Sequence, residues 1–456
     1  MTRIFGHYVA LEMFVLWLCE FLPCFLVLYL LLAQAAMPGA GMDADQWIDL
    51  TAADQAAVLS LTVGLASIAI GLYRPEICLQ TRRLLINATV AGLLASVASL
   101  AVAAALGIDL GRLLNHGLTR PLQILVVWVV FLFSTRLLFS MALRSNLFAR
   151  RVLIIGSARS AARIEEAIGS LRRGFFMVAA ITPAAEAAEL SPQALRRHRI
   201  WGVVVTSEVR GSVPLPGLLR SKRAGYRIFS DVEFREEQLR RIDLDHLEPD
   251  WMLFADGLAC SRVEMVLRRC GDILVSLLLL VATLPVIALT AVLIKLDSPG
   301  PVLYRQERVG LHSKVFTLLK FRSMRVDAEA RGPAWAAQRD PRVTRVGAFI
   351  RRTRIDELPQ LINVLRGEMG FVGPRPERPH FVDQLAEVIP FYRDRACVKP
   401  GITGWAQVNY PYGASIEDAR QKLSYDLYYV KHRNLFLDLM ILFATVRVIL
   451  FQEGAR

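Results

Sequence analysis

The chain has 456 residues, of which 54% are hydrophobic, and it carries a formal net charge of +13. A water-soluble globular protein seldom combines so apolar a composition with so basic a balance. The combination instead indicates several membrane segments and basic surfaces that meet anionic lipid headgroups or phosphorylated substrates. Nucleic acid is not an expected partner, because the basic residues follow the apolar segments instead of forming a stripe with interleaved aromatic residues. The length allows two or three domains.

The cysteines and histidines carry little chemical signal. The six cysteines include no C-x-x-C pair, which favours reduced, structural thiols. The seven histidines include no pair spaced as metal ligands, so a zinc site is not expected.

The first third of the sequence predicts a four-helix transmembrane domain over residues 1–149. Four apolar segments approach the ~20 residues that cross a bilayer; they are Tyr8–Ala35, Val58–Tyr73, Leu84–Leu106 and Leu122–Leu143. Arginines follow the second and fourth segments, whereas aspartates crowd the connection after the first. The positive-inside rule therefore places both ends of this unit in the cytoplasm. The first segment is too long for a signal-peptide core, so we expect it to be a retained anchor.

Arg136 is a charge inside the fourth segment. It could be a functional intramembrane residue, but packing within the bundle or snorkelling to the interface is the favoured interpretation.

Residues 150–250 predict a small α/β, Rossmann-like domain. The apolar run that begins at Arg151 leads into a turn and a helical pattern, and short apolar runs recur at 177–182, 201–207 and 226–231. The turn has Gly156, but Ala158 replaces the second glycine of a dinucleotide motif, and no acidic residue ends the next strand. A structural or regulatory role is therefore favoured over cofactor binding.

Residues 251–456 form the third predicted domain, which begins with an apolar segment at 270–296. Pro285 lies at its middle, where it removes a helical hydrogen bond and should break or bend the helix. Basic residues flank the segment on both sides, so crossing would place a strongly basic remainder outside. We expect a re-entrant helix, with a fifth membrane-crossing helix as the alternative. A second apolar helix, at 434–451, is expected to lie at the membrane interface or to pack under the re-entrant segment.

The stretch Arg351–Pro379 carries the strongest chemical signal. It places the carboxylates of Asp356 and Glu357 between arginines that include Arg351 and Arg375. Arginine forks match phosphate oxygens, and a carboxylate can hold Mg²⁺ or attack phosphorus. Alone, the stretch could equally be a helix with an ordinary mixed-charge face.

Further basic residues precede this stretch. Lys320 and Arg322 could hold substrate phosphates or touch lipid headgroups. The PRPERP run should present Arg375 on a stiff loop. Asp426 lies on a helical pattern near the end of the chain.

Taken together, residues 262–456 resemble the bacterial sugar transferases, the polyprenyl-phosphate hexose-1-phosphate transferases of exopolysaccharide and O-antigen synthesis. The motifs that carry the resemblance occur in order along the domain; they are DSPGPVLYRQERVG, KFRSM, DELPQLINVLRGEMGFVGPRPERP, KPGITGWAQVN and YDLYYVKH. Residues 1–261 look like the four-helix and Rossmann-like extension of the large monotopic members.

The resemblance implies the reaction and its participants. A sugar-1-phosphate, with glucose or galactose as the expected sugar, passes from a UDP-sugar to undecaprenyl phosphate and releases UMP, with Mg²⁺ as cofactor. Asp356 would be the nucleophile, forming a phosphosugar-aspartyl intermediate, and also a metal ligand, while Glu357 assists. The resemblance assigns phosphate binding to Lys320, Arg351 and Arg375, and a supporting role to Asp426. The site would lie on the cytoplasmic face of the bacterial inner membrane, in contact with the lipid bilayer, and a homodimer is left open.

Two departures and two alternatives accompany this interpretation. Small family members have a basic residue soon after QVN, where this chain has Tyr410 to Tyr412, and Asn434 stands where a serine is common. The alternatives are a membrane-bound nucleotide-sugar dehydratase or dehydrogenase, which would need a competent glycine-rich turn, and a non-catalytic scaffold of polysaccharide assembly.

Overall fold

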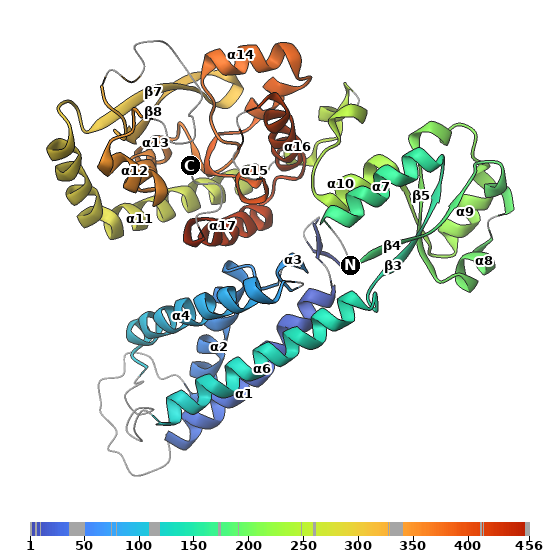
Figure 1. The fold of residues 1–456 in the computed structure, drawn as a ribbon, viewed down its shortest axis with the longest axis horizontal. Helices are drawn as coiled ribbons and strands as arrows, with labels where there is room; N and C mark the ends of the chain where they lie inside the picture. Colours follow the sequence, from blue (N-terminus) through green and yellow to red (C-terminus); the bar gives the residue numbers. More distant parts are fainter. Residues whose placement is uncertain are drawn as a thin grey trace. The chain divides into compact units, whose positions relative to one another are not determined.

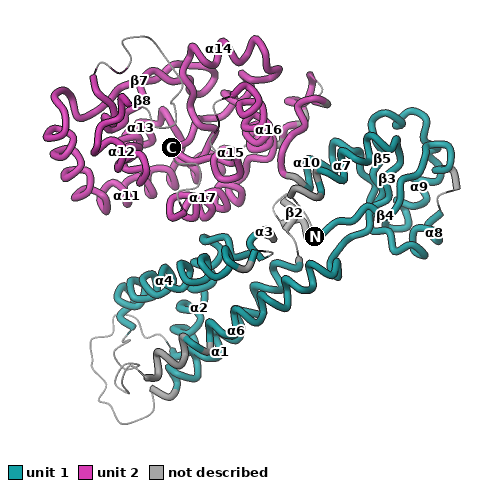
Figure 2. Tube along the Cα trace, viewed as in Figure 1, with its two compact units in different colours: residues 1–239 teal, residues 240–456 magenta. Residues whose placement is uncertain are grey.

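The computed structural model describes residues 2–4, 7–9, 11–35, 51–73, 75–78, 80–108, 119–171, 175–189, 191–247, 249–258, 261–326, 328, 341–410, 413 and 415–451. The chain forms two compact units, residues 1–239 and 240–456 (Figure 2). The boundary at 239/240 places residues 240–250 with the C-terminal unit. The division into two units does not test the predicted boundaries of three domains, which stay a prediction.

Long apolar helices fill the first part of unit 1. The helices are α1 (Leu11–Ala35), α2 (Ala52–Ala69), α3 (Pro75–Cys78), α4 (Thr81–Leu106) and α6 (Thr119–Arg144). Three of the four predicted segments coincide with helices long and apolar enough to cross a membrane, at Glu12–Ala33, Ala52–Ala69 and Arg82–Leu106, and α6 contains the fourth. The short strands β1 (Thr2–Ile4) and β2 (His7–Val9) precede α1, so the first helix begins later than predicted. The acidic connection after α1 lies mostly outside the described residues.

Arg136 packs inside the helical bundle instead of snorkelling. Its guanidinium is fully buried and forms a two-pronged pair with Glu20 of α1, at 2.6 Å (Nε to Oε1) and 2.8 Å (Nη2 to Oε2). Tyr73 donates its hydroxyl to Glu20 at 2.7 Å, and its ring faces the guanidinium. In an apolar bundle a charge is tolerated only when paired in this way, so the cluster joins α1, α6 and the turn before α3.

The second part of unit 1 confirms the predicted parallel α/β region. Four parallel strands lie in the order β4-β3-β5-β6 (Figure 1). Helices α7 and α10 pack on one face of the sheet, and α8 and α9 on the other. The elements are β3 (Arg150–Ile155), α7 (Ala158–Leu171), β4 (Phe176–Thr182), α8 (Pro192–Arg197), β5 (Ile200–Val205), α9 (Leu215–Arg223), β6 (Arg227–Ser230) and α10 (Asp231–Leu239).

Unit 2 is mainly helical, as predicted. Its helices are α11 (Arg262–Asp297), α12 (Arg345–Arg352), α13 (Gln360–Arg366), α14 (Pro379–Val388), α15 (Trp405–Asn409), α16 (Ile416–His432) and α17 (Leu435–Leu450). The hairpin β7 (Leu303–Val309) and β8 (Val315–Phe321) and the parallel pair β9 (Gly370–Val372) and β10 (Gly401–Thr403) complete it. Asn434 caps α17 by accepting from the Leu437 amide, so it does the capping work of a serine.

Helix α11 stays helical across Pro285, and its ribbon turns along its length (Figure 1). The proline therefore bends the helix without interrupting it, because one missing amide removes one hydrogen bond while those on either side remain.

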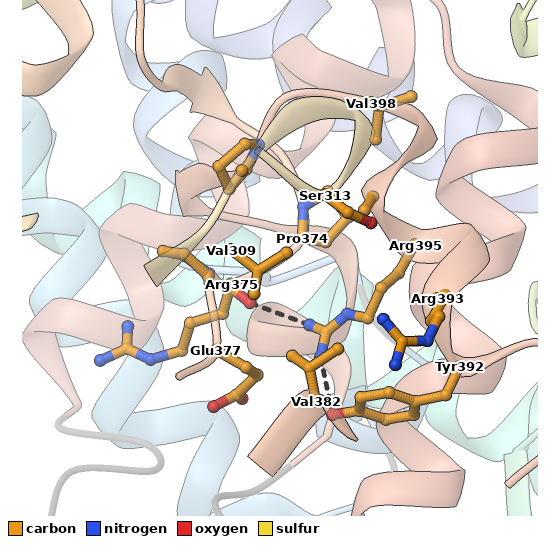
Figure 3. Close-up of a pocket in the computed structure, with 14 residues that line it drawn as sticks. Val309, Ser313, Pro374, Arg375, Glu377, Val382, Tyr392, Arg393, Arg395 and Val398 are labelled. Carbon is orange, nitrogen blue, oxygen red and sulfur yellow. Dashed lines mark hydrogen bonds between the residues drawn. The ribbon is translucent and has the colours of Figure 1, made fainter. Parts of the chain in front are cut away.

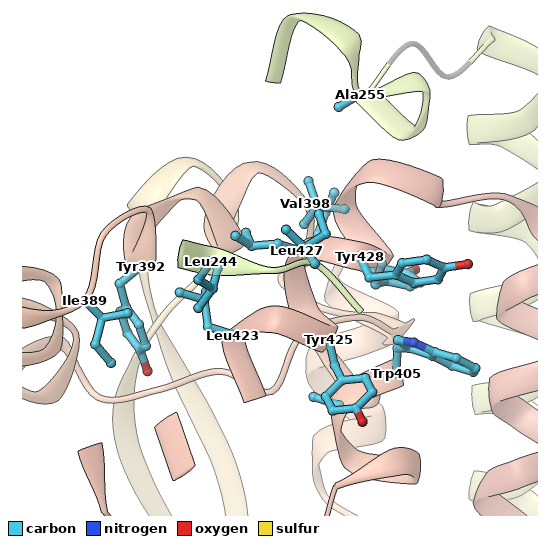
Figure 4. Packing of buried hydrophobic residues seen from close by; sticks show 14 of the residues in the cluster. Leu244, Ala255, Ile389, Tyr392, Val398, Trp405, Leu423, Tyr425, Leu427 and Tyr428 are labelled. Carbon is cyan, nitrogen blue, oxygen red and sulfur yellow. The ribbon is translucent and has the colours of Figure 1, made fainter. Parts of the chain in front are cut away.

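The main core of unit 2 lies around α16. Trp405 stacks on Tyr428, and Leu427 of α16 is fully buried beside them (Figure 4). Burying such side chains stabilises the fold by ~1.5–3 kcal/mol each. This core packs α16 against α15 and against the 3-10 turn Tyr392–Cys397, which carries a residue of the site described next.

Candidate active site

A cavity of about 520 Å³ lies within unit 2, and basic residues dominate its lining. Among the residues that the structure describes, eleven cationic side chains line it against three carboxylates, so the cavity suits an anionic ligand. The cations are Arg308, Lys320, Arg322, Arg325, Arg342, Arg351, Arg354, Arg375, Arg378, Arg395 and Lys422; the acids are Asp356, Glu357 and Glu377. Six of the seven residues that the sequence nominated for this unit's chemistry line this cavity; the seventh is Asp426.

Asp356 and Glu357 enter the cavity from a tight turn between α12 and α13. Ile355–Glu357 form a single 3-10 turn that follows Arg354, whose φ of 60° is left-handed. Both carboxylates are buried, with 7% and 9% of their residue surface exposed. The prediction of a helical pair is refined: 3-10 geometry separates neighbouring side chains by about 120°, so the two carboxylates face different partners.

Glu357 is enclosed by cations. Its Oε1 accepts from Arg375 at 2.7 Å and lies 3.4 Å from Lys320 Nζ and 3.5 Å from Arg354 Nη1. Burial alone would raise the pKa of this carboxyl, but Arg375, Lys320 and Arg354 together lower it below its usual range. Glu357 is therefore a fixed anion that organises the cations around it.

Asp356 has a different environment. Its closest cation is Lys320, at 4.0 Å from Oδ2, and within the described chain its carboxylate accepts no hydrogen bond. Burial raises the pKa of Asp356, which Lys320 opposes and Glu357 reinforces. A buried carboxylate with an uncommitted oxygen is poised to act on a ligand in the cavity.

Lys320 and Arg351 both line this cavity. Burial lowers the pKa of Lys320, and Glu357 partly opposes that shift. Arg351 Nε donates to Ser323 Oγ at 2.9 Å, which leaves the terminal nitrogens of its guanidinium for other partners.

Arg322 is placed differently from its neighbours. It is only 5% exposed, and its terminal nitrogens donate to the carbonyls of Pro299 at 2.8 Å and Ser298 at 2.7 Å. In this geometry Arg322, which follows the last residue of β8, holds the end of α11. Its predicted phosphate role would require those bonds to be exchanged.

The PRPERP loop that carries Arg375 is held by two buried arginines. Arg395 donates to the Arg375 carbonyl at 2.9 Å and to the Tyr392 hydroxyl at 2.9 Å, above a hollow of about 20 Å³ (Figure 3). Arg308 donates to the Pro376 carbonyl at 2.9 Å. The stiffness predicted from three prolines therefore has an additional source, which is side chains from outside the loop.

Asp426 supports the site through Arg395. The two side chains pair at 2.7 Å, with Asp426 only 2% exposed. Burial raises the pKa of Asp426 to about 6 against the opposing effect of Arg395. Burial lowers the pKa of Arg395, but Asp426 and Tyr392 raise it by more, so the net shift of this pKa is upward. Arg395 therefore keeps its charge in this pair, whereas burial disfavours the charged form of Asp426.

Sequence reasoning missed Arg395, Arg308 and Lys422 as site residues. Lys422 Nζ donates to the Gly413 carbonyl at 2.6 Å beside the cavity, so it brings a cation close to the segment where the expected basic residue is missing. Arg308 lies in the DSPGPVLYRQERVG motif but not beside the carboxylates in the sequence, and Arg395 and Lys422 lie in no motif. The fold brings them to the cavity from β7, from the 3-10 turn Tyr392–Cys397 and from α16.

The glycine turn of unit 1 shows packing instead of a phosphate cradle. A Cβ at Gly156 would lie 2.2 Å from Thr206 Oγ1, so the glycine is required by close contact between adjacent strand ends. Glu208 accepts from Ser157 at 2.7 Å at the start of α7, where a dinucleotide phosphate would need to lie. This geometry lends no support to the dehydrogenase alternative.

A resident metal site is not built into the described residues, which contain no group of three or more acidic, histidine or cysteine ligands. Mg²⁺ commonly binds through one or two carboxylates plus substrate phosphates, and Asp356 provides one such carboxylate. The donor set therefore fits a metal that arrives with a diphosphate.

A buried carboxylate in a cation-lined cavity is suited to bind a phosphorylated ligand, and the same unit contains a helix long and apolar enough to cross a membrane. Comparison with known proteins gives the family. The model of the bacterial sugar transferase family matches residues 263–452, and the chain belongs to this family.

Three relatives illustrate the relationship. The UDP-N-acetylgalactosamine-undecaprenyl-phosphate N-acetylgalactosaminephosphotransferase of Aeromonas hydrophila is 44% identical over 239 residues, 52% of this chain and 56% of that protein. The UDP-glucose:undecaprenyl-phosphate glucose-1-phosphate transferase of Escherichia coli (strain K12) is 44% identical over 188 residues, 41% of this chain and 40% of that protein. The exopolysaccharide production protein PSS of Rhizobium leguminosarum bv. phaseoli is 44% identical over 193 residues, 40% of this chain and 95% of that protein.

The aligned region thus spans about half of the first relative and less of the second. The family assignment predicted from the ordered motifs is confirmed.

Proposed function

We propose that this protein transfers a sugar-1-phosphate from a UDP-sugar to undecaprenyl phosphate, as an early membrane step of polysaccharide synthesis. The observation that carries the proposal is the pair of buried carboxylates, Asp356 and Glu357, in the cation-lined cavity. The names of the relatives support this reaction class, and they include both glucose and N-acetylgalactosamine as the transferred sugar. The expectation of glucose or galactose therefore widens to include N-acetylhexosamines.

The chemistry follows from the unequal carboxylates. An oxygen of Asp356 attacks the phosphorus that bears the sugar, the bond between that phosphorus and the bridging oxygen of UMP breaks, and UMP leaves with the bond's electrons. A phosphate oxygen of undecaprenyl phosphate then attacks the same phosphorus. The Asp356–phosphorus bond breaks, which regenerates the carboxylate and leaves a lipid diphosphate sugar.

The surrounding residues divide the remaining work. Lys320, Arg351 and Arg375 bind phosphate oxygens and stabilise the charge that develops on them. Glu357 keeps Arg375 and Lys320 oriented through the contacts described above. Mg²⁺ would be held by Asp356 together with the diphosphate, and when bound it neutralises phosphate charge.

Helix α11 supports a re-entrant arrangement, because both of its ends are held by the same unit. Near its start, Arg269 donates to the Val364 carbonyl at 2.6 Å, and Asp272 accepts from the Phe371 amide at 2.9 Å. At its end, Asp297 accepts from the Val346 amide at 3.1 Å. A straight helix of 36 residues would extend ~54 Å. Contacts of both helix ends with the same unit therefore favour a bent helix that enters and leaves the membrane on one side.

The apolar side chains between these anchors are exposed in unit 2 and need a membrane to cover them. They include Leu274, Leu277, Leu278, Val281, Leu284 and Leu289. On the charge pattern of the N-terminal helices, the cavity then faces the cytoplasm at the inner membrane, where a soluble UDP-sugar and a lipid phosphate can meet.

The test is a UMP-release assay with the purified full-length protein, Mg²⁺, undecaprenyl phosphate and a panel of UDP-sugars. We expect UMP with at least one of UDP-glucose, UDP-galactose and UDP-N-acetylgalactosamine, and none from an Asp356→Asn variant that folds normally. Absence of UMP with every UDP-sugar would overturn the proposal. UMP release from Asp356→Asn at the wild-type rate would instead show that Asp356 is not the nucleophile.

A further inference from the structure

Helix α12 ends in a residue with an unusual backbone conformation. Arg354 follows the C-cap Thr353 and has φ 60° and ψ 13°, the left-handed region. Residues at this position of a helix terminus are most often glycine, because a side chain makes the conformation costly. The same domain uses a glycine elsewhere: α13 ends at Gly367, with φ 85°. An arginine at the end of α12 therefore needs a reason.

The side chain of Arg354 lies in the cavity. It lines the cavity wall, is 30% exposed, and places Nη1 at 3.5 Å from Glu357 Oε1. That oxygen is the same one that Arg375 and Lys320 approach. Three cations thus lie close to one carboxylate oxygen. Arg354 reaches that oxygen from the residue just before the turn that carries Asp356 and Glu357.

One carboxylate cannot neutralise three cations. With Arg351 added on the same wall and Asp356 counted as an anion, positive charge still exceeds negative charge around the turn. Such an excess is costly in a partly buried site unless an anion enters it. A diphosphate ester has the charge and the oxygen geometry that guanidinium groups prefer.

We propose that Arg354 is a donor-binding residue whose guanidinium contacts the diphosphate of the nucleotide sugar, and that this contact explains an arginine where the backbone favours glycine. The inference rests on the proposed function and adds a binding residue to it. Arg354 then binds substrate directly, whereas a residue that only oriented Glu357 would affect turnover without changing donor affinity.

The test uses Arg354→Gly, which preserves the left-handed conformation while removing the guanidinium. Donor affinity is measured by calorimetry with UDP-glucose, UDP-galactose and UDP-N-acetylgalactosamine on an Asp356→Asn background, so that no turnover occurs. We expect Arg354→Gly to weaken donor binding about tenfold or more. Its melting temperature should equal or exceed that of the parent, because glycine relieves the backbone strain. Arg354→Lys should recover part of the affinity.

Arg199→Gly is the matched control, because Arg199 also has a left-handed φ, of 52°, and is exposed in unit 1. It should leave donor affinity unchanged. Equal donor affinity with and without Arg354 would overturn this inference alone, even if Arg354→Gly in the otherwise wild-type protein lost turnover. Failure of the Asp356→Asn parent to bind any of the three nucleotide sugars would instead overturn the proposed function, and this inference with it.

Discussion

The buried pair between Arg395 and Asp426 leads to an asymmetric prediction about stability. Asp426→Ala should remove the carboxylate paired with Arg395, which would keep its hydrogen bonds to the Arg375 carbonyl and the Tyr392 hydroxyl and the electrostatic attraction of Glu377. Removing one partner of a buried pair costs ~3–5 kcal/mol, and a guanidinium cannot escape the cost by losing its proton. We therefore expect Asp426→Ala to lower the free energy of unfolding by about that amount throughout pH 6–8.

Arg395→Met should behave differently, because a carboxyl can neutralise itself. Burial already raises the pKa of Asp426 to about 6, and Arg395 opposes that rise, so removing Arg395 should raise the pKa further. A carboxyl with a folded-state pKa above its unfolded-state pKa stabilises the fold at low pH. This stabilisation is lost as the pH rises to the folded-state pKa. Lowering the pH from 8 to 6 should therefore reduce the difference in the free energy of unfolding between Arg395→Met and the wild type. The reduction should be ~1.4 kcal/mol for each pH unit below the pKa that Asp426 has in the variant.

The assay is denaturant unfolding of the full-length protein in detergent, followed by tryptophan fluorescence, with both single variants and the double variant. The double variant should cost less than the sum of the singles, because no unpaired charge remains. Asp383→Ala is the control: Asp383 pairs with Arg393 at the same 2.7 Å, but both side chains are more than half exposed. It should cost under ~1 kcal/mol. The reasoning is refuted if Asp426→Ala and Arg395→Met each cost under ~1 kcal/mol and if the cost of the double variant is their sum.

Three further predictions concern the cavity, the bundle and a close backbone contact. Lys320→Met should move the acid limb of the pH–rate profile to higher pH, because Lys320 lowers the pKa of Asp356 and the nucleophile must be ionised; an unmoved limb would contradict this. Glu20→Ala should leave the buried guanidinium of Arg136 unpaired and lower the melting temperature by several degrees, corresponding to ~3–5 kcal/mol, whereas an unchanged melting temperature would show that the pair is not structural. Gly373→Ala should destabilise unit 2, because the added Cβ would lie 2.3 Å from a backbone carbonyl oxygen, and a stability equal to wild type would show that the loop can shift.

The parts of the fold with a strong local pattern could be predicted from the sequence. The apolar segments became long helices, and the recurring short apolar runs became the parallel strands of unit 1, because each pattern records which faces are buried. Asp356, Glu357 and Arg375 could be nominated together because they lie within twenty residues of one another, and a short turn plus a proline-stiffened loop keeps such neighbours close.

The remaining site residues depend on tertiary contacts that no local pattern encodes. Arg322 shares a motif with Lys320 but binds the end of α11, because the fold places the carbonyls of that helix end beside it. Arg395 comes from an irregular turn and becomes important only when α16 brings Asp426 against it. The left-handed backbone of Arg354 is likewise invisible in a sequence that shows an ordinary arginine among several.

The central claim, that Asp356 is the nucleophile, is tested most directly by trapping its covalent adduct. The full-length protein is incubated with a UDP-sugar accepted in the UMP-release assay and with Mg²⁺, in the absence of undecaprenyl phosphate, and is then analysed by intact-protein and peptide mass spectrometry. We predict a mass increase of one sugar phosphate, located on Asp356, absent in Asp356→Asn and discharged when undecaprenyl phosphate is added. A sugar-phosphate adduct on another residue, or turnover with UMP release from Asp356→Asn, would contradict the account.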